Sequence, residues 1–365
     1  MSPTGGEGLR VLVVEDSAYQ RLRIVEALRT AAGVSEVEAV GTGEEAIRRL
    51  LTHDFGLVTL DLGLPGMDGH AVLRWIMANK PLPVVVISAD REERNALMAL
   101  EAGALDVLGK AGAHPESLGR WKKRLADVVE GARGLSMESL LRRSVERAAG
   151  PPPSGQIHAP ARVPARAPAL SGEPPGLVVA ASTGGPPALR ELFMGLPAQQ
   201  AVVGVAQHMP PPFTRSLAQR LASGTSWDVR EAVSGAEASP GVVWIAPGGG
   251  HLEFVRHGER LLLNVAPHGP SARWCPSADL LFASAASAFG PRLVGVVLTG
   301  MGDDGAQGSR AIAAAGGTVL CESRETAVIS GMPDAAARAV PDARRVPLPR
   351  LPAEIERRLT DAARA

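Results

Sequence analysis

The sequence predicts an α/β protein with two doubly wound, mainly parallel sheets joined by a proline-rich linker. Two regions in which short apolar runs alternate with amphipathic stretches flank a segment of different composition. The chain has 365 residues, which corresponds to two domains at roughly 100–200 residues per domain. Apolar residues make up 45% of it and aromatic residues only 3%, so we expect cores built from aliphatic side chains.

The first alternating region covers residues 9–130 and follows a polar, flexible N-terminus at residues 1–8. Its short runs are apolar throughout, which is typical of strands that helices cover on both faces. Amphipathic stretches such as Tyr19–Arg29 and Glu92–Leu100 predict helices between the strands. We expect strands at Val11–Val14, Val37–Val40, Leu57–Leu60, Val84–Ile87 and Leu105–Leu108.

The middle segment, residues 131–175, differs in composition from both flanking regions. It contains Pro151-Pro152-Pro153 and further prolines, arginine outnumbers the acidic residues, and large apolar side chains are sparse. Such a segment buries too little apolar surface to offset the entropy of ordering, so it predicts a linker between domains. Ser136–Ala148 is a candidate extension of the last helix of the first domain.

The second alternating region covers residues 176–362. Arg260–Val265 alternates apolar and polar residues and predicts a hairpin with Leu252–Arg256. We expect the main strands at Leu177–Ala181, Val202–Ala206, Val242–Ala246, Leu293–Thr299 and Thr318–Cys321.

Composition excludes several classes of protein. The 38 basic and 38 acidic residues balance, which argues against a protein that mainly binds nucleic acid. Two cysteines are too few for a disulfide framework. The polar start contains no apolar signal-peptide core, and no apolar run reaches the roughly 18–20 residues that span a bilayer. We therefore expect a cytoplasmic protein without membrane insertion.

Acidic residues follow two strands of the first region. Glu15 and Asp16 come directly after the first strand, and Asp61 follows the third. The carboxyl ends of neighbouring parallel strands meet in one crevice, where three carboxylates need a hard cation such as Mg²⁺. Ser88 and Lys110 end two further strands and supply the hydroxyl and ammonium that a phosphoryl group on Asp61 requires.

This region resembles the receiver domains of two-component response regulators, which have a flavodoxin-like fold. The matching motifs are Val-Val-Glu-Asp-Ser at 13–17, Leu-Asp-Leu-Gly-Leu-Pro-Gly-Met-Asp-Gly at 60–69, Val-Ile-Ser-Ala at 86–89 and Lys110. The resemblance implies that Asp61 accepts a phosphoryl group from a histidine kinase. It also implies that Glu15, Asp16 and Asp61 hold Mg²⁺ with a backbone carbonyl near Gly63, while Ser88 and Lys110 sense the phosphorylated state.

Two positions depart from the receiver pattern. Receivers usually carry an aromatic residue three positions before the lysine, where this chain has Val107. A proline usually follows the lysine, where this chain has Ala111. Both departures concern the switching mechanism rather than the phosphorylation chemistry.

A nucleophile, a base and an acid follow three strands of the second region. Ser182 lies between a strand and a glycine turn that opens a helix, His208 follows a second strand, and Asp304 lies in the glycine-rich turn after a third. These are the residue types of a nucleophile, a general base and the group that orients the base. Spacing alone leaves His251 as a second possible base, and leaves Asp303 and Asp279 as possible acids beside Asp304.

The second region resembles the catalytic domain of chemotaxis protein-glutamate methylesterases, with a Rossmann-like fold. The resemblance extends over residues 176–345 and follows a receiver domain, as in that family. It rests on Ser-Thr-Gly-Gly at 182–185, Gln-His-Met at 207–209, Phe213-Thr214, Ile-Ala-Pro-Gly-Gly at 245–249, His251-Leu252, Pro276-Ser277 with Asp279, Leu-Thr-Gly-Met-Gly-Asp-Asp-Gly-Ala at 298–306, and Gly-Met-Pro at 331–333. Ala180, where the family usually has glycine, and the neighbourhood of Cys321 depart from it.

The resemblance implies an enzyme that hydrolyses γ-glutamyl methyl esters of methyl-accepting chemoreceptors and deamidates receptor glutamines. Ser182 is then the nucleophile, His208 the base and Asp304 the orienting acid. The backbone N–H groups of Met301 and Thr183 would support the oxyanion. The ester hydrolysis would need no cofactor. From the domain architecture we further hypothesise that the receiver, on its flexible linker, covers the catalytic cleft and that phosphorylation of Asp61 relieves this block.

Three different functions compete with this interpretation. The chain could be a docking module or phosphate sink without enzymatic activity, although the intact serine, histidine and aspartate argue against it. A DNA-binding output is disfavoured because the second region alternates strands and helices instead of forming a basic helical domain. The same ester chemistry could also serve a client outside chemotaxis.

Overall fold

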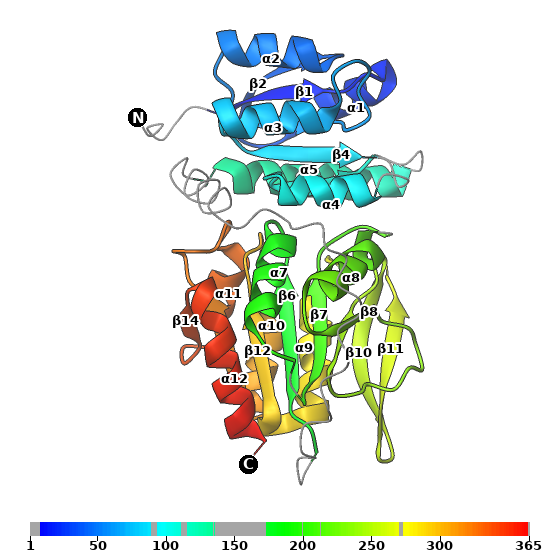
Figure 1. Cartoon of the computed structure of the whole chain (residues 1–365), viewed down its shortest axis with the longest axis vertical. Coiled ribbons are helices and arrows are strands. Elements are labelled where there is room, and N and C mark those ends of the chain that lie inside the picture. Colours follow the sequence, from blue (N-terminus) through cyan, green and yellow to red (C-terminus); the bar gives the residue numbers. More distant parts are fainter. Residues whose placement is uncertain are drawn as a thin grey trace. The chain divides into compact units, whose positions relative to one another are not determined.

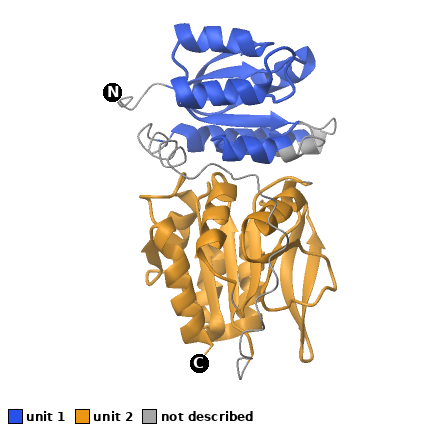
Figure 2. Cartoon of the chain, in the orientation of Figure 1, with its two compact units in different colours: residues 1–154 blue, residues 155–365 orange. Residues whose placement is uncertain are grey.

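The structure is a computed structural model of the whole chain, which folds into two compact units, residues 1–154 and 155–365 (Figure 2). It describes residues 8–88, 93–110, 115–133, 135, 173–198, 200–211, 213–269 and 273–363. The expected helix at Ser136–Ala148 and most of the expected linker lie outside these ranges. No helix in the described part is long and apolar enough to cross a membrane.

The first unit is a five-stranded parallel sheet with strand order β2-β1-β3-β4-β5 (Figure 1). The strands are β1 (Leu9–Val14), β2 (Val34–Val40), β3 (Leu57–Leu60), β4 (Val84–Ser88) and β5 (Asp106–Gly109). The helices are α1 (Ala18–Thr30), α2 (Gly43–Thr52), α3 (Gly69–Asn79), α4 (Glu93–Glu101) and α5 (Pro115–Arg133). The strands β1, β3 and β4 are almost entirely buried, as their continuous apolar runs predict.

The second unit is a seven-stranded parallel sheet with order β14-β13-β12-β6-β7-β9-β8. Its strands are β6 (Gly176–Ala181), β7 (Val202–Gln207), β8 (Asp228–Glu231), β9 (Val242–Ile245), β12 (Leu293–Val297), β13 (Thr318–Glu322) and β14 (Arg344–Val346). A separate antiparallel hairpin of β10 (Gly250–His257) and β11 (Arg260–Pro267) has the expected pairing. The edge strands β8 and β14 were not predicted from the sequence.

Helices cover both faces of this second sheet. They are α7 (Gly185–Gly195), α8 (Phe213–Gly224), α9 (Ala278–Phe289), α10 (Ala306–Ala314), α11 (Gly331–Ala339) and α12 (Leu351–Ala362). Figure 1 shows α7 and α12 on one face, with α9 on the other. Short 3-10 turns at Gly290–Arg292 (η2) and Leu348–Arg350 (η3) complete the unit. The core includes Val178, Phe254, Phe282, Val297 and Ile312. The predicted fold class of two α/β domains is confirmed.

Both sheets reverse their strand order beside the first strand of the unit. In the first unit the chain moves from β1 to β2 and then returns to β3 on the other side of β1. In the second it moves from β6 to β7 and later returns to β12 on the other side of β6. Such switch points leave an open crevice at the carboxyl ends of the strands, where α/β proteins bind ligands.

We expect a side chain at Gly69 to destabilise the first unit. An added Cβ would lie 2.2 Å from the Asp61 carbonyl oxygen and 2.6 Å from the Leu62 Cα, and neither backbone atom can move cheaply. Gly69→Ala should lower the free energy of unfolding by about 2 kcal/mol or more. Denaturant unfolding of the full chain measures this.

Gly119→Ala is the matched control. Gly119 lies inside α5, and its added Cβ would meet no atom within 4 Å. Alanine should therefore raise stability by about 0.5–1 kcal/mol through helix propensity. Equal effects of the two substitutions would contradict the close packing at Gly69.

Candidate functional sites

The acidic residues of the first unit meet at its switch point. Glu15 and Asp61 are buried at the ends of β1 and β3, while Asp16 is exposed. One carboxylate oxygen from each of the three lies within 4.8 Å of the others. The structure therefore brings together the three residues that we expected to hold a metal ion.

Lys110 joins the two buried carboxylates. Its Nζ donates to Glu15 Oε1 at 3.0 Å and to Asp61 Oδ2 at 2.7 Å. Burial, reinforced by the charge of Asp61 and opposed by Lys110, raises the pKa of Glu15 to about 7. Burial acts to lower the pKa of Lys110, but its hydrogen bonds to the two carboxylates outweigh this and raise it.

The donor set fits a hard divalent cation. Glu15 Oε2 is buried and has no hydrogen-bond partner among the described residues. The single Lys110 ammonium thus donates to both buried carboxylates, while Glu15 Oε2 has no hydrogen-bond donor among the described residues. A cation held by oxygen ligands would supply the missing positive charge.

The other residues that we expected to take part in phosphorylation and switching belong to the neighbouring strand ends. Ser88 ends β4, and its carbonyl accepts the backbone N–H of Lys110 at 3.0 Å. The pairing of Leu60 with Val86 puts Ser88 one residue beyond the level of Asp61. Val107 is buried in β5, and Ala111 lies outside the described residues.

Ser182 and His208 lie side by side at the switch point of the second unit. The last pair between β6 and β7 is Ala181 with Gln207, so the next residue of each strand is Ser182 and His208. The backbone N–H of His208 donates to the Ala181 carbonyl at 3.0 Å. Gln207 Nε2 donates to the Ser182 carbonyl at 2.9 Å and so anchors the backbone turn that follows β6.

The turn after Ser182 requires glycine. Gly184 has φ 77°, a conformation that favours glycine. At Gly185, the first residue of α7, an added Cβ would lie 2.0 Å from Gln207 Oε1. Ser182 therefore stands at a tight strand-to-helix turn next to the N-terminus of α7, where the helix dipole favours developing negative charge.

His208 and Asp304 form a buried pair. His208 Nε2 lies 2.7 Å from Asp304 Oδ2, and the two residues are 4% and 2% exposed. Because an ionised carboxylate can only accept, Nε2 carries the proton of the neutral ring. The lone pair of the neutral ring then lies on Nδ1.

The N-terminus of α9 holds the Asp304 carboxylate. The backbone N–H groups of Ala278 and Asp279 donate to it at 2.7 and 2.9 Å, and the Ser277 hydroxyl donates at 3.2 Å. Burial acts to raise the pKa of Asp304, but the His208 interaction and these backbone N–H groups outweigh it and lower the pKa. Asp304 is thus an ionised, fixed partner for His208.

Asp279 makes the reciprocal contact. It lies in the first turn of α9 and accepts the N–H groups of Gly305 and Gly308 at 2.9 and 2.7 Å, at the start of α10. Burial is the main cause that raises the pKa of Asp279. The N-terminus of α9 therefore binds the Asp304 carboxylate from the turn before α10, and the N-terminus of α10 binds the Asp279 carboxylate from α9.

Asp303 and His251, which the sequence also allowed as acid and base, make different contacts. Asp303 is exposed and pairs with Arg273 at 3.1 Å. His251 is buried, and its Nδ1 accepts the Ser277 N–H at 3.1 Å. Within the described part of the chain, Asp304 is the candidate acid that hydrogen-bonds to His208.

The turn after β12 packs against Ser182. The Ser182 N–H donates to the Thr299 carbonyl at 3.0 Å, and a Cβ on Gly300 would lie 2.8 Å from Ser182 Cβ. The Thr299 hydroxyl donates to the Thr183 carbonyl at 3.0 Å. Met301 therefore follows a backbone segment that contacts Ser182. Thr183, the residue after Ser182, is buried.

Comparisons with known proteins match both units. The "CheB methylesterase" family model matches residues 177–355, and the "Response regulator receiver domain" model matches residues 11–119. A protein-glutamate methylesterase/protein-glutamine glutaminase of Geobacter sulfurreducens is 41% identical over 96% of this chain and 97% of its own length. A protein of the same name from Myxococcus xanthus is 40% identical over 93% and 94%.

The chain belongs to the CheB methylesterase family. The resemblance that the sequence motifs indicated is confirmed for both units. Among solved structures, the Thermotoga maritima CheB methylesterase catalytic domain is 34% identical, covers 50% of this chain and 98% of its own, and has a TM-score of 0.49.

Trp274 is a residue of this CheB family member that the sequence patterns did not indicate. Its ring stacks on the His208 ring with centroids 5.0 Å apart and planes 5° apart, and the Arg273 guanidinium lies 5.0 Å from the Trp274 ring centroid. The indole therefore packs flat against one face of the imidazole. Trp274 belongs to a loop rather than to a strand end, so no strand pattern pointed to it.

We expect Mg²⁺ to stabilise the first unit increasingly as the pH rises through about 7. The folded-state pKa of Glu15 lies above its ordinary value of 4.5, so the protonated carboxyl contributes stability below 4.5 that is lost as the pH rises through about 7. A bound cation then replaces the lost proton. Thermal unfolding with and without Mg²⁺, from about pH 6 to about pH 8, measures this.

Glu15→Gln is the control, because it removes the titrating group at nearly constant shape. It should flatten the pH dependence of the Mg²⁺ effect. A Mg²⁺ effect in the natural protein that is equally large at all these pH values would contradict the expected role of Glu15.

Proposed function

We propose that this chain is a phosphorylation-regulated protein-glutamate methylesterase that also deamidates glutamine side chains. Its substrates would be methyl-accepting chemoreceptors, and its location the cytoplasm, where the modified receptor helices lie. The names of its relatives support this activity. The observation that carries the proposal is the buried pair of His208 and Asp304 beside Ser182.

Ester hydrolysis begins with Ser182. His208 Nδ1 takes the proton of Ser182 Oγ as the oxygen attacks the γ-carbonyl of the methylated glutamate. The C–O bond to the methoxy group then breaks, and the His208 proton leaves with methanol. Water, activated by the same imidazole, attacks the acyl-enzyme and releases the glutamate carboxylate and free Ser182. A glutamine substrate follows the same steps, with ammonia as the leaving group.

The surrounding groups stabilise the charges that develop. Asp304 holds the imidazole in the correct tautomer and stabilises the imidazolium that forms. Trp274 stacks on the imidazole ring and restricts its orientation. The backbone N–H groups of Met301 and Thr183 are proposed donors to the oxyanion.

Control would come from the first unit. Asp61 would accept a phosphoryl group from a histidine kinase, and Glu15, Asp16 and Asp61 would hold Mg²⁺. The cation would neutralise charge on the transferring phosphoryl group. Ser88 and Lys110 would contact the phosphoryl oxygens, and Lys110 would exchange its ion pair with Asp61 for one with the phosphate.

The acid assignment can be tested with two adjacent aspartates. Asp304→Asn should lower methanol release from a methylated chemoreceptor fragment by about 10³–10⁴-fold, because the His208 tautomer is no longer fixed. Asp303→Asn removes an exposed ion pair and should leave the rate within about twofold. Ser182→Ala should lower the rate by at least about 10⁴-fold. Equal losses for Asp303→Asn and Asp304→Asn would contradict the assignment.

The phosphorylation site can be tested with acetyl phosphate. Acetyl phosphate and Mg²⁺ should increase methanol release by the natural protein and leave Asp61→Asn unchanged, since the acceptor carboxylate is absent. Asp54→Asn is a suitable control, because Asp54 is an exposed acid that pairs with Lys80 away from the cluster. Stimulation of Asp61→Asn to the natural level would refute this role of Asp61.

A further inference from the structure

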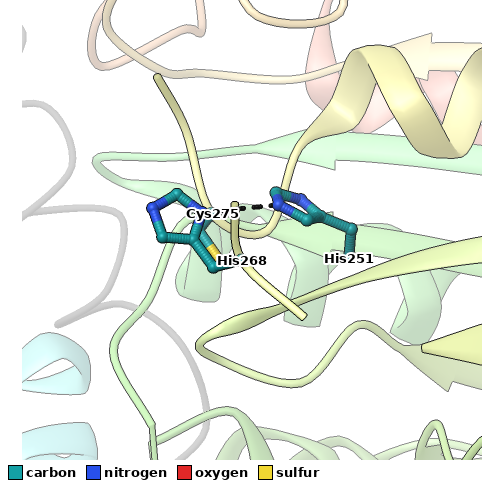
Figure 3. Close-up of side chains that lie close together, drawn as sticks. All are labelled: His251, His268 and Cys275. Atoms are coloured by element: carbon teal, nitrogen blue, oxygen red, sulfur yellow. Dashed lines mark hydrogen bonds between the residues drawn. The ribbon is translucent and has the colours of Figure 1, made fainter. Parts of the chain in front are cut away.

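A second cluster of reactive side chains lies next to Ser277, which helps to hold the Asp304 carboxylate. Neither the proposed esterase mechanism nor the proposed phosphorylation uses this cluster. His251 lies in β10, His268 directly follows β11, and Cys275 lies in the loop before α9. One ligand atom from each lies within 4.8 Å of the others. Figure 3 shows the Cys275 side chain against the His268 ring and the His268 ring directed at His251.

The spacing of the two imidazoles suits a shared metal ion. His268 Nδ1 and His251 Nε2 are 3.4 Å apart, which is long for a hydrogen bond between nitrogens. Two nitrogens at about 2.0–2.1 Å from a tetrahedral zinc ion are about 3.3 Å apart. The Cys275 sulfur, which now donates to the Gly250 carbonyl at 3.5 Å, would be the third ligand; Cys275 is half-buried like His268.

The ligand types select the metal. One thiolate and two imidazoles favour zinc and other thiophilic divalent cations over Mg²⁺ or Ca²⁺, which prefer oxygen. Water would fill the fourth position. On binding, Cys275 loses its thiol proton to the solvent.

A metal ion at this cluster conflicts with the present hydrogen bonds of His251. The Ser277 N–H donates to His251 Nδ1 at 3.1 Å, so the neutral ring carries its proton on Nε2. A metal ion at Nε2 needs the lone pair there and moves the ring proton to Nδ1. The His251 Nδ1–H and the Ser277 backbone N–H would then face each other, and the Ser277 backbone would have to move.

That movement would reach the catalytic acid. The Ser277 hydroxyl and the next two backbone N–H groups all bind Asp304. We infer that His251, His268 and Cys275 form an inhibitory binding site for a thiophilic divalent cation of the zinc class. The inhibition, though not the binding, rests on the proposed esterase function.

Cobalt(II) provides a direct test of binding on the full-length chain. A thiolate ligand gives Co²⁺ a near-ultraviolet charge-transfer band, which carboxylate and imidazole ligands do not. Excess Mg²⁺ is present to occupy the carboxylate cluster of the first unit. We expect the band in the natural protein and in Cys321→Ala, and its loss in Cys275→Ser. A missing band in the natural protein, or one that persists in Cys275→Ser, would overturn the site.

Zinc inhibition is tested on the same proteins by methanol release. Zn²⁺ should lower the rate of the natural protein by at least about fivefold, and a chelator should restore it. Cys275→Ser should keep its rate without metal and need at least about tenfold more Zn²⁺ for the same inhibition. Binding without inhibition would refute the coupling to Asp304. A metal-free natural protein with no activity would refute the esterase proposal, while the cobalt spectra would still decide the site.

Discussion

The second unit depends on a reciprocal exchange of carboxylates between two helix N-termini. Asp304 lies in the turn that leads into α10 and accepts the N–H groups at the start of α9, while Asp279 in α9 accepts those at the start of α10. Each carboxylate satisfies backbone donors that have no partner within their own helix. The exchange locks the two helices together. It also fixes one oxygen of Asp304 at hydrogen-bonding distance from His208.

The sheet topology explains why the two sites occur where they do. In each unit the strand order reverses beside the first strand, and residues from several strand ends meet at that point. The first unit places Glu15 and Asp61 there, after β1 and β3. The second places Ser182 and Asp304 there, after β6 and β12. The same architecture thus carries two different chemistries, which are set by the side chains at the strand ends.

The strands were largely predictable because buried parallel strands are apolar throughout. The edge strands β8 and β14 were not, because their outward residues are polar and exposed and they have only one neighbour. The positions of Ser182, His208 and Asp304 at strand ends were visible in the sequence. Strand-end spacing alone could not choose between Asp303, Asp304 and Asp279, since the choice depends on how α9 meets the turn after β12; the family resemblance supplied it. Ser277 followed by an acid two residues later is a helix N-cap signal that could have indicated this contact.

The buried acids of the two units are stabilised in different ways, and this difference bears on their roles. The hydrogen bond to His208 and the fixed backbone N–H donors of Ala278 and Asp279 keep the pKa of Asp304 low. Glu15 shares one lysine with Asp61, and its pKa is raised to about 7. The charge of Asp304 is therefore built into the fold, which suits a group that must always orient a base. The charge balance of Glu15 and Asp61 instead rests on the one Lys110 ammonium that they share, and under the proposed function it would change on phosphorylation, which suits a switch.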